Sequence, residues 1–105
     1  MNAMDEIKRK IKEGKYEFSK HALDQSIIRN ISLDELEQAL LGNSERIENY
    51  PNDKYGPSCL ILGFTKQNRP LHIQCSSPKR TLIKIITLYE PAQTLWENFK
   101  IRKQN

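Results

Sequence analysis

One predicted helix could place a base and a cation on the same face. His21, Gln25 and Arg29 recur at a spacing of four residues within residues 20–30, a segment that we predict to be helical. An imidazole can act as a general base, and a guanidinium can hold a phosphate through two hydrogen bonds. The alternative is a solvated helix face with a histidine that caps the helix. The spacing therefore offers phosphate chemistry without requiring it.

A second histidine lies in a predicted strand. Leu71, Ile73 and Cys75 alternate with His72 and Gln74, which predicts a strand with one apolar and one polar face. On that polar face His72 could belong to an active surface that faces the basic loops. The alternative is a half-buried histidine that is hydrogen-bonded to a neighbouring side chain.

Lys84 interrupts an otherwise apolar β-rich segment, residues 82–89. An ammonium in such a place must reach water, pair with a carboxylate or serve a site. An edge position that lets the side chain reach solvent is the interpretation that the pattern favours.

Basic and aromatic side chains also occur in predicted loops and at strand ends. Lys79 and Arg80 stand in a loop, where they could steer a phosphate backbone or only keep the chain soluble. Tyr50, Tyr55 and Tyr89 flank strand ends, where a tyrosine can stack on a base or donate to a phosphate. The alternative for the tyrosines is that they cover the core.

The sequence shows no cofactor motif and no metal-ligand pattern. His21 and His72 are the two histidines of the chain, and no carboxylate cluster completes a metal site. A Walker loop, a dinucleotide fingerprint and a nucleophile elbow are all missing from the sequence. We therefore expect no cofactor. RNA can be cleaved without one, because its own 2′-hydroxyl attacks the adjacent phosphate and the protein supplies a base, an acid and a cation.

The first half of the chain predicts helices. Apolar residues at helical spacing indicate helices at about residues 4–14, 20–30 and 32–42. Ser32 and Glu35 have the spacing of a capping box at the start of the third helix. In the second helix we expect Leu23, Ile27 and Ile31 to form the buried stripe, and we interpret residues 16–18 as a connector.

The second half predicts strands and a final helix. The strands are expected at about residues 46–50, 59–65, 71–75 and 82–89. Pro91 can open a last helix with an apolar face of Leu95, Trp96 and Phe99, followed by a basic tail at residues 100–105. Together these elements predict an α+β fold, with N-terminal helices packed on one side of a small antiparallel sheet and a C-terminal helix.

Length and composition are those of one small domain. The 105 residues predict a single domain with an ordered core at about residues 4–99. Lys and Arg number 17 against 13 Asp and Glu, which permits an anionic partner such as nucleic acid. We expect Cys59 and Cys75 to be buried and reduced, with a disulfide between facing strands as the alternative. The sequence predicts neither a membrane span nor a signal peptide, and hence a cytoplasmic location.

Several stretches taken together resemble a known family. They are Phe18-Ser19-Lys20-His21-Ala22, Arg29-Asn30-Ile31-Ser32, Gly42, the run from Tyr50 to Ser58, Arg69-Pro70-Leu71-His72-Ile73 and Ile86-Thr87-Leu88-Tyr89-Glu90-Pro91. Over about residues 4–96 the chain resembles DUF4258, a family of short bacterial proteins described as a domain of unknown function. That family is grouped with the RelE/ParE-type toxins and is similar in outline to the BrnT and MqsR toxins.

The resemblance implies a RelE/ParE-like fold and the toxin of a type II toxin–antitoxin system. Such a toxin would be a metal-independent endoribonuclease that acts on mRNA, is associated with the ribosome in some cases, and pairs with an antitoxin protein. By motif, the resemblance gives catalytic roles to His21, Arg29, His72 and Tyr89. We further assign RNA or phosphate contacts to Tyr55, Arg69, Lys79, Arg80 and Lys84.

Two alternatives to a ribonuclease stay open. Related sequences often carry a second arginine shortly after the histidine of the His-Ala motif, where this chain has Leu23-Asp24-Gln25. That departure favours a non-catalytic module that binds RNA or a protein through the same basic surface. A third hypothesis is a structural or regulatory protein that contacts only other proteins.

Overall fold

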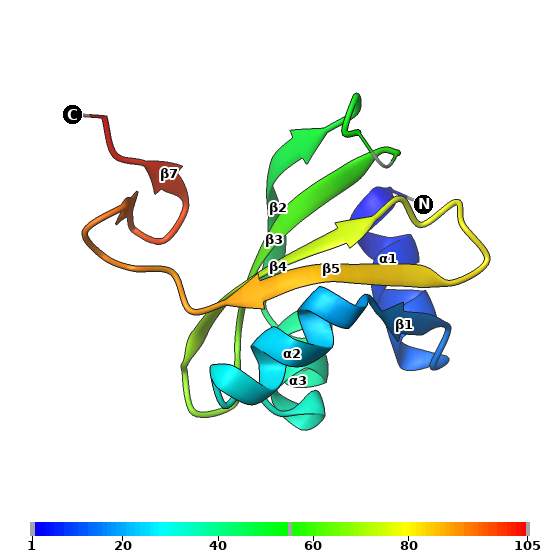
Figure 1. Ribbon diagram of the computed structural model, residues 1–105, viewed down its shortest axis with the longest axis horizontal. Helices are drawn as coiled ribbons and strands as arrows, with labels where there is room; N and C mark the ends of the chain where they lie inside the picture. Colours follow the sequence, from blue (N-terminus) through cyan, green and yellow to red (C-terminus); the bar gives the residue numbers. More distant parts are fainter. Residues whose placement is uncertain (1, 55, 105) are drawn as a thin grey trace.

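The computed structural model describes residues 2–54 and 56–104, and within them it contains helices, a mixed sheet and a small hairpin (Figure 1). The helices are α1 (Ala3–Lys12), α2 (Lys20–Ile28) and α3 (Leu33–Leu41). The strands are β1 (Tyr16–Phe18), β2 (Ser44–Tyr50), β3 (Ser58–Phe64), β4 (Pro70–Ser76), β5 (Ile83–Tyr89), β6 (Trp96–Glu97) and β7 (Ile101–Arg102). None of the helices in this described part has the length and apolar character needed to cross a bilayer.

The helix boundaries follow the capping signals of the sequence. The Ser32 hydroxyl accepts from the Glu35 amide at 3.0 Å, and the Glu35 carboxylate accepts from the Ser32 amide at 3.1 Å. Ser19 caps α2 in the same way, by accepting from the Ala22 amide at 3.0 Å. Gly14 adopts a φ of 75° just beyond α1, a conformation that glycine adopts without strain. These boundaries confirm the three predicted N-terminal helices.

The sheet is mixed, not purely antiparallel as predicted. Its strand order is β1-β5-β4-β3-β2, in which β2 to β5 form an antiparallel meander and β1 pairs in parallel with β5. Residues 16–18 are therefore an edge strand and not a connector. A strand of three residues gives almost no alternation to recognise, and its partner lies far along the chain, so only the tertiary structure reveals the pairing.

The helices cover one face of the sheet and enclose the core (Figure 1). Ile7 and Ile11 of α1 and Leu36 and Leu40 of α3 are all buried. They pack with the inward side chains of the three central strands, which are Cys59, Ile61, Leu71, Ile73, Cys75, Ile83, Ile85 and Leu88. Within the described residues, no helix covers the opposite face of the sheet.

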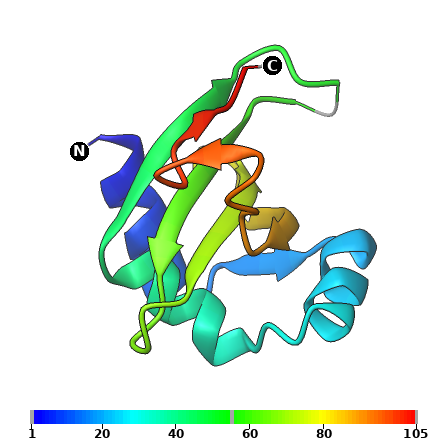
Figure 2. The ribbon, with the colours of Figure 1, turned by 90° about the vertical axis from the view of Figure 1, so that its left-hand side faces the viewer.

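The face of α2 that is buried differs from the predicted one. Leu23 is 51% exposed and Ile27 is 73% exposed, whereas Ala22 and Ile31 are buried. The helix lies beside β5 and β1 at the margin of the sheet (Figure 2) and packs there through a small side chain. Apolar residues occur on several sides of this helix, so periodicity alone could not identify the side that meets the sheet.

The predicted C-terminal helix is wrong. The segment after β5 is irregular and then forms the hairpin of β6 and β7, which crosses the helix-free face of the sheet (Figure 2). Asn98 and Phe99, with φ values of 52° and 63°, are the central residues of a β-turn in the loop of this hairpin, in which the Lys100 amide donates to the Glu97 carbonyl at 3.0 Å. Ile101 and Arg102, predicted as part of a tail, pair with β6. Side-chain contacts to the sheet select the hairpin in spite of the helical spacing of apolar residues.

Candidate functional site

The candidate residues divide into two main groups along β5. One group, at the C-terminal end of the strand, contains Arg29, Arg69, His72 and Tyr89. The other contains His21, Arg80 and Lys84, lies along β5 between Lys84 and Thr87, and lines a cavity of about 390 Å³. The two groups line different cavities, and His72 is buried, so they do not share one open site.

His72 is fully buried beneath the C-terminal hairpin. Its Nε2 lies 2.6 Å from the carbonyl oxygen of Phe99, and its Nδ1 lies 3.2 Å from the Tyr89 hydroxyl. Because a carbonyl can only accept, Nε2 carries the proton, and Nδ1 accepts from the Tyr89 hydroxyl. The Trp96 ring packs edge-on against the imidazole at 4.4 Å between centroids. The expected polar sheet face is therefore covered at His72.

Burial favours the neutral forms of both His72 and Tyr89. Burial lowers the pKa of His72, although the hydrogen bond to the Phe99 carbonyl opposes that shift. Burial likewise raises the pKa of Tyr89. A buried imidazole with both nitrogens occupied is poorly placed to exchange a proton with a substrate. We therefore assign His72 a role in docking the hairpin.

Arg29 and Arg69 hold the backbone near the same end of β5. Arg29 donates to the Leu88 carbonyl at 2.8 Å, and its guanidinium lies 5.8 Å from the centre of the Tyr89 ring. Arg69 donates to the carbonyls of Arg29 and Asn30 at 3.1 and 2.9 Å. These contacts join the end of α2 to β5 and to the β3–β4 turn.

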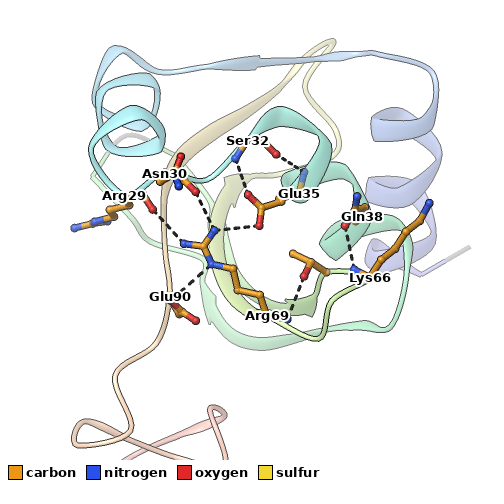
Figure 3. A network of polar contacts seen from close by, with 9 residues as sticks. Arg29, Asn30, Ser32, Glu35, Gln38, Lys66, Arg69 and Glu90 are labelled. Carbon is orange, nitrogen blue, oxygen red and sulfur yellow. Dashed lines mark hydrogen bonds and ion pairs between the residues drawn. The ribbon is translucent and has the colours of Figure 1, made fainter.

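Arg69 is also the cationic centre of an ion-pair network, drawn in Figure 3. Its guanidinium lies 3.0 Å from the Glu35 carboxylate and 3.7 Å from that of Glu90. The pKa of Glu35 is lowered chiefly by the hydrogen bond from the Ser32 backbone, with a further contribution from Arg69. Since these partners occupy the donors of Arg69, few remain for a phosphate.

The second group offers its polar atoms to an open cavity. The side chains that line it include Ser19, His21, Asp53, Ser76, Arg80 and Lys84. His21 and Arg80 are exposed, and Lys84 is partly exposed, with its ammonium 3.7 Å from the Glu17 carboxylate. Asp53 is the only acidic side chain among those that line the cavity, so the cationic side chains of its lining, Arg80 and Lys84, outnumber the acidic ones. Such a site suits an anionic ligand.

Local structure fixes where His21 lies. The Ser19 hydroxyl donates to the Ile86 carbonyl at 3.0 Å while it caps α2, so the first turn of the helix is attached to β5. His21 lies in that turn, and its Nε2 is 3.4 Å from the Thr87 hydroxyl, a long contact that leaves the ring free to meet a ligand. The N-terminus of α2 adds a partial positive charge near the imidazole.

The remaining predicted residues lie elsewhere. Lys79 borders a separate cavity of about 290 Å³ together with Arg46 and Cys59, and Tyr55 lies outside the described residues. Sequence reasoning assigned no role to Asp53 and Ser76 of the His21 cavity, although Asp53 lies in the run from Tyr50 to Ser58 that carries the family resemblance. Within residues 2–54 and 56–104, no group of three His, Cys, Asp or Glu side chains has the proximity needed to hold a metal ion.

Comparison with known proteins identifies the family. The family model described as "Domain of unknown function (DUF4258)" matches residues 18–90, which run from the last residue of β1 to just beyond β5 and include every candidate residue named above. No curated protein and no solved structure matches the chain. The match covers well over half of the 105 residues. The chain therefore belongs to the DUF4258 family.

Proposed function

We propose that the protein is a metal-independent endoribonuclease whose active site is the cavity lined by His21, Arg80 and Lys84. The observation that supports this proposal is the gathering of one exposed imidazole and two cations around a single opening. They can supply a base and the cations for RNA cleavage, because the nucleophile comes from the substrate itself and the protonated imidazole or water can serve as the acid. The toxin role, the mRNA substrate and an antitoxin partner are part of the proposal through the resemblance to RelE/ParE-type toxins.

The proposed mechanism assigns one task to each side chain. His21 accepts the proton of a 2′-hydroxyl, and the resulting oxygen attacks the adjacent phosphorus. Arg80 and Lys84 stabilise the negative charge that develops on the phosphate oxygens. The bond to the 5′-oxygen breaks, that oxygen takes a proton from the imidazolium or from water, and a 2′,3′-cyclic phosphate remains.

The test is cleavage of a fluorescently labelled RNA by the purified full chain in the presence of EDTA. We expect His21→Ala to lower the cleavage rate by at least about tenfold, because a positioned general base contributes that much or more. Lys12→Ala, which removes a charge from α1 outside the cavity, is the matched control and should leave the rate unchanged. Cleavage that EDTA abolishes, or that survives His21→Ala, would overturn the proposal.

A non-catalytic RNA-binding module is the second candidate. It is favoured by the burial of His72, which leaves His21 as the one exposed histidine and removes the second imidazole from any acid–base pair. In that case the protein would bind RNA without turnover. Binding would weaken with salt, and an Arg80→Ala, Lys84→Ala double variant would reduce the slope of that salt dependence, whereas His21→Ala would have little effect.

A further inference from the structure

The two cysteines face each other across the central strands. Cys59 of β3 and Cys75 of β4 are direct partners in the antiparallel register, and their sulfur atoms lie 4.0 Å apart. Directly opposed residues in antiparallel strands have Cα atoms about 4.5–5.5 Å apart, which falls within the range that a disulfide spans. Rotation of the two side chains is therefore enough to bring the sulfurs to bonding distance.

The two thiols differ in their access to solvent. Cys59 is 5% exposed and borders the cavity of about 290 Å³, together with Arg46 and Lys79. Cys75, beside it on β4, is completely buried in the core. A small solute that enters the cavity can thus reach Cys59 first, while Cys75 is placed to react only with Cys59.

The electrostatic surroundings of the two thiols also differ. The hydrogen bond from Cys75 lowers the pKa of Cys59, and the nearby Arg46 charge adds to that effect while burial opposes it. The same hydrogen bond, followed by burial, raises the pKa of Cys75. Since the thiolate is the reactive form of cysteine, Cys59 is the better nucleophile of the pair.

We propose that Cys59 and Cys75 form a redox-active dithiol that reacts with a small peroxide, with Cys59 as the attacking thiol and Cys75 as the resolving thiol. This site lies apart from the His21 cavity, and it does not depend on the proposed ribonuclease activity. It is a covalent modification site in the centre of the sheet.

The reaction proceeds in two balanced steps. The Cys59 thiolate attacks one oxygen of hydrogen peroxide, the O–O bond breaks, and hydroxide leaves while Cys59 becomes a sulfenic acid. The Cys75 sulfur then attacks the Cys59 sulfur, the S–O bond breaks, and a disulfide forms. The displaced hydroxides take up the two thiol protons, so two thiols and one peroxide give one disulfide and two waters. A small dithiol reductant reverses the change.

The experiment treats the full chain with hydrogen peroxide and then counts free thiols with a maleimide mass tag after denaturation. The native chain should lose both thiols together with about 2 Da of mass, and peptide mapping should show the Cys59–Cys75 link. This loss should be at least about fivefold faster than in the chain unfolded by denaturant, where Cys59 lacks its neighbours. Thiols that stay free, or disulfides that form only between molecules, would overturn the proposal.

Variants separate the two roles. In Cys75→Ser, a sulfenic acid should accumulate on Cys59 and be trapped by dimedone, whereas in Cys59→Ser the remaining thiol should react at least about tenfold more slowly than in the native chain. Equal reactivity of the two single variants would contradict the assignment.

Arg46→Gln alters only an exposed side chain, so it tests the proposal even if a cysteine variant fails to fold. It should slow the oxidation about twofold or more, while Lys12→Gln should not.

Discussion

Replacing His72 with alanine is expected to lower the free energy of unfolding by about 3 kcal/mol. The substitution empties a fully buried position and leaves the Phe99 carbonyl and the Tyr89 hydroxyl without their partner. It also removes the ring against which Trp96 packs. Trp96 is the only tryptophan of the chain, so urea unfolding followed by tryptophan fluorescence reports the loss directly and shows whether the hairpin has left the sheet.

The same residue should make stability depend on pH. Burial lowers the pKa of His72 below the value of about 6.5 that it has in the unfolded chain. Between the two pKa values the unfolded state binds more protons, so the free energy of unfolding falls as the pH falls. The contribution is fully present above about pH 6.5 and is lost as the pH falls through the lowered pKa of the folded state. His72→Ala should weaken this acid dependence, which urea titrations at several pH values would measure.

The outcome for His72 also bears on the catalytic assignment. A His72→Ala variant that keeps the stability of the native protein, and yet cleaves RNA much more slowly, would contradict the docking role. It would return His72 to the active site. Tyr89→Phe is the matched control, since it removes the hydroxyl that donates to His72 and keeps the ring beside Arg29. It should cost about 1 kcal/mol, the usual value of one hydrogen bond.

The parts of the fold that the sequence predicts are those fixed by local interactions. The capping box at Ser32 and Glu35 specifies the start of α3 within four residues of chain, and β3, β4 and β5 follow from apolar or alternating runs bounded by turns. β1 and the C-terminal hairpin depend instead on partners far away in the chain. Their local patterns are weak, or in the case of residues 91–99 favour a helix, so tertiary contacts decide their structure.

The candidate site shows the same contrast between features that the sequence reveals locally and features that depend on distant residues. The sequence marked His21 as a candidate base through its helical spacing and the family resemblance, and Arg80 and Lys84 as candidate phosphate contacts, and all three border one cavity. Sequence reasoning could not tell that His72 is covered, because the residues that cover it, Trp96 and Phe99, belong to the segment predicted as a helix. Nor could it tell that Arg69 is occupied by the carbonyls at the end of α2, since those contacts join residues about forty positions apart.

Replacing Gly63 with alanine is expected to cost about 3 kcal/mol or more of the free energy of unfolding. A Cβ atom at Gly63 would lie 2.3 Å from the Ala39 carbonyl oxygen and 2.7 Å from the carbonyl carbon. Both atoms belong to the backbone of α3, so no side chain can rotate to make room, and the whole helix must move away from β3. That movement would also disturb the packing of Leu36 and Leu40 in the core.

Gly14→Ala is the matched control for this prediction, because it adds the same methyl group where no atom lies within 4 Å. Its cost of about 1 kcal/mol would come only from the left-handed backbone conformation, with φ at 75°. Urea unfolding of the two variants compares steric exclusion with backbone strain in one protein. A Gly63→Ala variant as stable as Gly14→Ala would mean that α3 can shift on the sheet at little cost. The close contact between Gly63 and Ala39 would then not be what sets the distance between helix and sheet.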